Sequence, residues 1–414
     1  MFFSPFHRST ALAGTLFVLA VAGTAAMAAP VLGGPADQAI SQAPQPNDPR
    51  IASLVRQLGD PQFAARQQAT RDLQAIGPAA KEPLTQALQN PDAEVRLRAQ
   101  RILVHVLEAD FAARLEAFAF DTEGKSYDLP CWESFRKLAG DSPVARQLFA
   151  EAVRQEPVLL ETVQQDPRQA TEAIAQRCDA LLAHTSRTRA NRLSYAQPRS
   201  VSTARMAALL LAVCSTDIPL NDAVGTRVSQ LFHQSRMAND ISDKSDDQPL
   251  RRLLGAWVQR TADGNLAFQS VWLAMRFQLK EGLAPAVNLL KRGEQQPYVR
   301  QMAILAIGKL GQREHIPLLE PLLSDTASCN PNPEEAKTPY RCEIRDVALC
   351  AMIHLYGRKP KEFGFEKIQP HPQTLFNQNS MGFDSAAQRT AAVARWKAWQ
   401  EKQPTATGQF SPKR

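Results

Sequence analysis

The chain has 414 residues and a formal net charge of +7, with 44% hydrophobic and 21% charged residues. These fractions are typical of globular proteins and exclude a chain that is disordered throughout. Only 19 glycines and 5 tyrosines occur, while Ala, Leu, Gln and Arg recur along the whole sequence. This composition favours helix over sheet and predicts an all-α protein.

The first residues have the pattern of an export signal. His7 and Arg8 precede an uncharged apolar stretch that ends in Ala26-Met27-Ala28. A basic start, an apolar middle and an A-x-A end are typical of a secretory signal peptide, here residues 1–28. We expect a periplasmic or extracellular protein with no membrane span after signal removal. The alternative is a retained membrane anchor, which the Ala, Gly and Thr content disfavours.

Composition and periodicity divide the rest of the chain into consecutive parts. They are a Pro-rich linker (29–49), N-terminal repeats (50–109), a divergent helical segment (110–250), C-terminal repeats (251–357) and a tail (358–414).

Four windows of the chain share one helical pattern. In each, an Arg follows the first apolar residue, and further apolar residues recur every three or four positions. These arginines are Arg66, Arg96, Arg300 and Arg345. A shorter apolar run precedes each window. In the first two, Asp60-Pro61 and Asn90-Pro91 lie in the turn, where we expect Asp60 and Asn90 to cap the second helix. Helix pairs repeating at 30 residues or more predict an α-solenoid, a right-handed superhelix of antiparallel pairs.

The segment Asp92-x-x-Val95-Arg96-x-x-Ala99 resembles the second-helix signature of HEAT repeats, particularly the short HEAT type. The resemblance covers about residues 50–107 and 280–357. It implies that the four repeat arginines and Asp92 hold successive repeats in register, although Gln296 replaces the Asp in the third repeat. After the first repeat pair come the segment Tyr127 to Phe135, a late Arg-Asp-Val-Ala helix, and a tail with Phe363-Gly364-Phe365 and a Trp pair. This wider layout is similar to that of exported HEAT-repeat proteins of planctomycete-type bacteria, which imply no known activity.

The middle segment is helical by pattern but has no clean repeat. Trp132 and Phe135, three positions apart, predict one buried face. A basic run follows, with Arg187, Arg189, Arg192, Arg199 and Arg205. It is either a site for an anionic polymer or a solvated loop. Export and the scarcity of aromatic residues argue against nucleic acid. The acidic loop that follows, Asp240 to Asp247, lacks the spacing of a calcium loop.

Six cysteines are too few for a disulfide scaffold. Cys329 and Cys342 bracket a Pro-rich insert, so they form either a disulfide or a pair of free thiols. A zinc site could be formed by Cys342, Cys350 and His354, with Cys329 as a fourth ligand. Their spacing matches no zinc module, so we expect these side chains to be packed in the core instead. We therefore expect no metal and no cofactor.

The tail contains a predicted helix from Ala386 to Gln400. Trp396 and Trp399 lie on one face of it, three positions apart. We expect this helix to fold back and cap the last repeat, whose open end exposes core. The alternative is an outward anchor for a partner.

The sequence carries none of the nucleophile, dinucleotide, P-loop, zinc-protease or C-x-x-C motifs. It therefore predicts an exported, non-enzymatic protein-interaction scaffold with a protein partner. Two alternatives remain: a lyase-like HEAT protein or enzyme subunit acting on a bound cofactor, and a structural component of the envelope.

Overall fold

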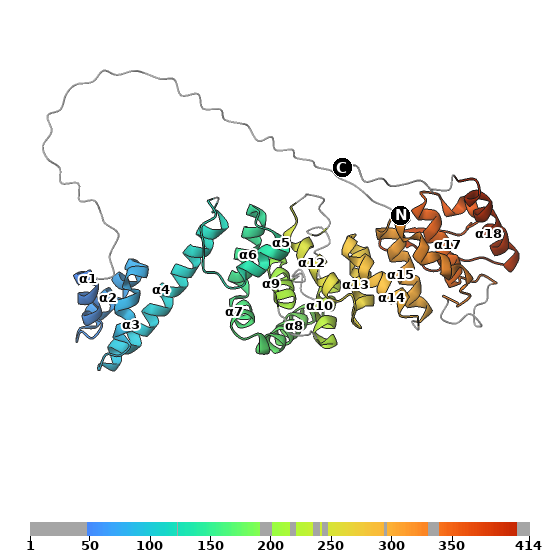
Figure 1. Cartoon of the computed structure of the whole chain (residues 1–414). Coiled ribbons are helices and arrows are strands. Elements are labelled where there is room, and N and C mark those ends of the chain that lie inside the picture. The colour runs from blue at the N-terminus through green and yellow to red at the C-terminus, as the bar shows by residue number, and fades with distance from the viewer. Residues whose placement is uncertain are drawn as a thin grey trace, which may run out of the picture.

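The computed structural model describes most of the chain beyond the predicted signal peptide (Figure 1). The described residues are 48–121, 123–190, 201–215, 221–234, 241, 247–293, 296–329 and 339–403, without the side chains of 184–190 and 233–234. In these residues the chain is mostly helical with little strand, which confirms the all-α prediction. The predicted signal peptide and nearly all of the predicted linker lie outside them.

The N-terminal helices form a small core of their own. They are α1 (Pro49–Gln57), α2 (Phe63–Ile76), the 3₁₀ turn η1 (Gly77–Ala80), α3 (Lys81–Ala87) and α4 (Ala93–Ala119). Asp92 caps α4 by accepting a hydrogen bond from the Glu94 amide at 2.8 Å. The predicted capping by Asp60 and Asn90 is wrong, because their side chains bond amides inside the turns and the helices begin three residues after them.

The middle helices surround the largest core. They are α5 (Trp132–Ala139), α6 (Pro143–Gln155), α7 (Pro157–Gln165), α8 (Pro167–Ala190), α9 (Thr203–Ser215), α10 (Asp222–Gln234), α12 (Pro249–Arg260) and α13 (Ala267–Phe277). The Trp132 ring lies 4.6 Å from Phe118 and 5.0 Å from Phe149 between centroids, distances at which aromatic rings attract. Trp132 and Phe135 are both buried, as their spacing predicts.

The C-terminal helices share a third core with a short tail. They are η2 (Lys280–Gly282), α14 (Leu283–Lys291), α15 (Pro297–Leu310), η3 (Arg313–His315), α16 (Ile316–Leu319), η4 (Glu320–Ser324), α17 (Ile344–Leu355), η5 (Pro360–Phe363) and α18 (Ala386–Gln400). Strands β1 (Pro370–His371) and β2 (Leu375–Phe376) pair antiparallel between η5 and α18. Helix α18 has the bounds predicted from the sequence.

The cores are joined in two different ways. Helix α13 buries Leu273 in the middle core and Val271 in the C-terminal core, so these two cores meet at one helix. Helix α4 instead buries Ile102 in the N-terminal core and Phe118 in the middle core, at opposite ends of its length. In Figure 1, α4 accordingly runs from the α1–α3 group to the α5–α7 group.

Candidate functional site

The first two repeat arginines make the same contacts. Arg66 Nη1 donates to the carbonyl oxygens of Asp60 and Pro61, six and five residues before it, at 2.7 and 3.0 Å. Arg96 Nη1 donates to the equivalent carbonyl oxygens of Asn90 and Pro91, at 2.7 and 2.9 Å. A charged guanidinium forms stronger hydrogen bonds than a neutral donor. Each arginine therefore fastens its helix to the turn that precedes it.

Contacts between the first two helix pairs lie beside these arginines. Arg66 Nε lies 3.6 Å from Glu94 Oε1, at the start of α4. Gly59, in the first turn, lies so close to Val95 and Asp92 that a Cβ added to it would be 2.9 and 3.0 Å from their side chains. Asp92 thus has two roles, as the cap of α4 and as a neighbour of the preceding turn.

The C-terminal repeat arginines make different contacts. Arg300 on α15 forms an ion pair with Asp325, which follows η4 of the next helix pair. Arg345 on α17 donates instead to Glu343 Oε2 at 2.6 Å, only two residues away. The Arg345 backbone amide donates to the Asp325 carbonyl oxygen at 3.0 Å. Arg300 therefore crosses between helix pairs, whereas the Arg345 side chain stays local.

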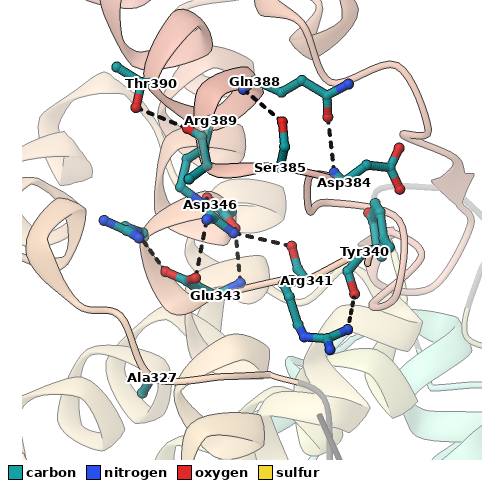
Figure 2. Close-up of polar contacts among 12 residues, drawn as sticks. Ala327, Tyr340, Arg341, Glu343, Asp346, Asp384, Ser385, Gln388, Arg389 and Thr390 are labelled. Carbon is teal, nitrogen blue, oxygen red and sulfur yellow. Dashed lines mark hydrogen bonds and ion pairs between the residues drawn. The ribbon is translucent and has the colours of Figure 1, made fainter. Parts of the chain in front are cut away.

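A buried ion pair fastens α18 to α17 (Figure 2). Arg389 Nε and Nη2 donate to the two carboxylate oxygens of Asp346 at 2.8 and 3.0 Å, and Nη1 lies 3.2 Å from Glu343 Oε1. Asp346 is only 2% exposed. Burial raises the pKa of its carboxyl, although the hydrogen bonds and charge of Arg389 act in the opposite direction. No local pattern in the sequence pairs these two residues, which are 43 positions apart.

The tryptophan face of α18 packs against the end of the C-terminal core. Trp396 is buried, and Trp399 is half-buried and stacked on it with ring centroids 5.0 Å apart. Tyr356, which follows α17, lies 5.5 and 5.3 Å from the two rings, and Phe363 of η5 also contacts both. Both tryptophan rings therefore lie against aromatic residues that follow α17.

Cys329 and Cys342 lie directly opposite each other on two antiparallel segments. The Cys329 amide donates to the Cys342 carbonyl oxygen at 2.9 Å, and Ser328 and Glu343 form the adjacent bridge. Both thiols are free and hydrogen-bonded to each other, which together with burial raises the pKa of Cys342. The Cα atoms of directly opposite residues are about 4.5–5.5 Å apart, within the range of a disulfide.

Of the predicted basic run, only the Arg205 side chain lies among the described residues. Arg205 forms an ion pair with Glu156 at 3.3 Å. Arg192 and Arg199 lie outside the described residues, as do the side chains of Arg187 and Arg189. The acidic loop also lies outside them, apart from Ile241 and its last residue, Asp247.

The described residues contain no group of three or more His, Cys, Asp and Glu side chains placed to hold a metal ion. Cys350 is fully buried, and burial lowers the pKa of His354. None of the described helices combines the length and the apolar character that crossing a membrane requires.

A groove of about 460 Å³ opens between α4 and α7. Leu107 and Phe111 of α4 and Pro130 are among its apolar lining residues, and Asp128 and Glu161 are its acidic ones. Leu97, Val104, Phe111 and Phe118 follow one another at heptad spacing along α4 and lead to this groove. The helical pattern predicted around Arg96 does not include this spacing.

Comparison with known family models and with characterised proteins finds no match to this chain.

Proposed function

We propose that the protein is an exported, non-enzymatic protein-interaction scaffold built as a HEAT-like α-solenoid. The observation that carries this proposal is the repeated arginine contact. Arg66 and Arg96, 30 positions apart, bond the same pair of turn carbonyls in successive helix pairs. Equal contacts at a fixed offset are what a structural repeat produces.

The packing of later helices supports a continued array. Helix α15 contacts α13 and α14 on one side and α17 on the other, so it packs against helices that precede and follow it in the chain. Arg300 and Asp325 link two of these pairs. A solenoid of this kind presents a long surface formed by successive second helices, and such surfaces bind proteins or other extended ligands.

The experiment is affinity capture with the tagged chain from an envelope extract of the native host, followed by reconstitution from purified components. We expect one protein to co-purify in a fixed ratio and to bind again when both are purified. Cross-linking with mass spectrometry should then place it on the second helices. The proposal is wrong if no captured protein rebinds in purified form, or if the isolated chain turns over a cofactor-bound substrate.

Small-angle X-ray scattering tests the architecture separately. A solenoid predicts a maximum dimension well above that of a sphere of equal mass, because each added pair lengthens the particle. A compact, near-spherical scattering profile would contradict the solenoid.

A further inference from the structure

We propose that the open apolar face of α4, with the groove at its end, binds an amphipathic helix of a partner protein. The end of that helix in the groove carries Lys or Arg side chains. This inference rests on the proposed scaffold function and names the surface and the kind of partner.

The apolar face belongs to a stripe that is buried at only one end. Leu97, Val104, Phe111 and Phe118 follow one another at intervals of seven residues, which is two helical turns. Phe118 is buried in the middle core, and Phe111 is partly covered by it. Leu97 and Val104 are 44% and 52% exposed, and Leu107, beside the stripe, is 39% exposed.

The opposite face of this half of α4 is already occupied. Val95, Ala99, Ile102 and Val106 are buried in the N-terminal core. The helix therefore has two apolar faces over the same turns, of which the structure covers one. Apolar positions at heptad spacing fit the knobs of a second helix. The exposed stretch from Leu97 to Phe111 is about 21 Å long, the length of a helix of about four turns.

The charges at the end of the stripe select the partner. Asp128 and Glu161 line the groove, and none of the described cationic side chains forms an ion pair with either of them. Arg114, on the same groove, is held by Asp110 at 3.2 Å and lies over the Phe111 ring. Two carboxylates beside an apolar floor attract a segment that combines cationic and apolar side chains.

The test uses two synthetic helical peptides of about three heptads, each with Leu at the a and d positions. One carries Lys in its last heptad and the other carries Glu there. Binding to the purified full chain is measured by fluorescence anisotropy. We expect the Lys peptide to bind about fivefold more tightly, the size of one or two partly exposed charge pairs. The Asp128→Asn/Glu161→Gln variant should remove this preference and leave binding of the Glu peptide unchanged.

Val104→Glu tests the apolar face. We expect it to weaken binding of the Lys peptide more than about tenfold, because the contact would bury an unpaired charge. The matched control is Val144→Glu on α6, where the valine is 50% exposed outside the stripe and the groove. Equal binding by both variants overturns the proposal. A second result also overturns it: light scattering shows the unchanged chain at twice the monomer mass and Val104→Glu at the monomer mass. A second copy of the chain would then cover the face.

The captured partner separates this proposal from the scaffold function. If that partner binds Val104→Glu as well as it binds the unchanged chain, the α4 site is wrong while the scaffold function stands. If no partner rebinds in the capture experiment, the scaffold function itself fails.

Discussion

Removal of the Arg389 side chain should destabilise the C-terminal helices strongly. Arg389→Met keeps most of the side-chain volume but leaves Asp346, which is 2% exposed, as a buried carboxylate without its bidentate partner. Breaking a buried pair from one side costs about 3–5 kcal/mol. For a unit of this size, each kcal/mol lowers Tm by about 2–4 °C, so we expect a fall of about 10 °C.

The double variant shows whether the unpaired charge is the cause. Asp346→Asn removes the charge and keeps an oxygen for the Glu343 amide, which donates to Asp346 Oδ2 at 2.9 Å. Asp346→Asn/Arg389→Met should therefore be more stable than Arg389→Met alone. Arg395→Met, an exposed change on the same helix, is the matched control and should stay within about 0.5 kcal/mol of the unchanged chain. Calorimetry measures all three.

The loss of stability in Arg389→Met should depend on pH in a definite direction. Burial raises the pKa of the Asp346 carboxyl, and Arg389→Met removes the cation that lowers it. A carboxyl whose pKa is raised in the folded state contributes stability at low pH and loses it as the pH rises through that pKa. The deficit of Arg389→Met should therefore be largest near neutral pH and shrink on acidification. A loss below 1 kcal/mol, or a deficit that grows in acid, would refute the reasoning.

Four other predictions concern separate parts of the chain. Arg300→Met should cost about 1–2 kcal/mol by denaturant unfolding, since it removes a charge-assisted bond between helix pairs; an unchanged midpoint would contradict this. Exchange with glutathione disulfide should join Cys329 to Cys342 and add about 3 kcal/mol of stability, with the lost thiols counted by titration and Cys329→Ser as control. Trp396→Ala should cost about 3–5 kcal/mol by calorimetry, because the ring is buried; a loss below 1 kcal/mol would favour an outward anchor. N-terminal sequencing of the exported protein should begin at Ala29, and retention of Met1 would contradict export.

Helices with one apolar face were predictable because their signal is local. The stripe from Val95 to Val106 and the helix from Ala386 to Gln400 both follow from residue spacing alone. Residue spacing did not predict the full length of α4. Its second half buries the opposite face, and the two apolar stripes overlap between Leu97 and Val106.

The sequence did not predict which residues form ion pairs over long distances in the chain. Arg345 fits the repeat pattern as well as Arg300 does. Arg345 nevertheless pairs with Glu343, two residues away, whereas Arg300 pairs with Asp325 of the next helix pair. Which acid an arginine reaches depends on packing between elements. The pairing of Arg389 with Asp346 has the same origin, since β1, β2 and η5 lie between them in the chain.

Helix α4, which serves two cores at opposite ends of its length, makes the chain sensitive to length changes at one place. Between Val106, the last α4 residue in the N-terminal core, and Leu115, the first in the middle core, the helix is continuous. One inserted residue there would rotate one core against the other by about 100° and shift it by about 1.5 Å. Related chains should therefore tolerate insertions in the turns on either side of α4 and keep this stretch at constant length.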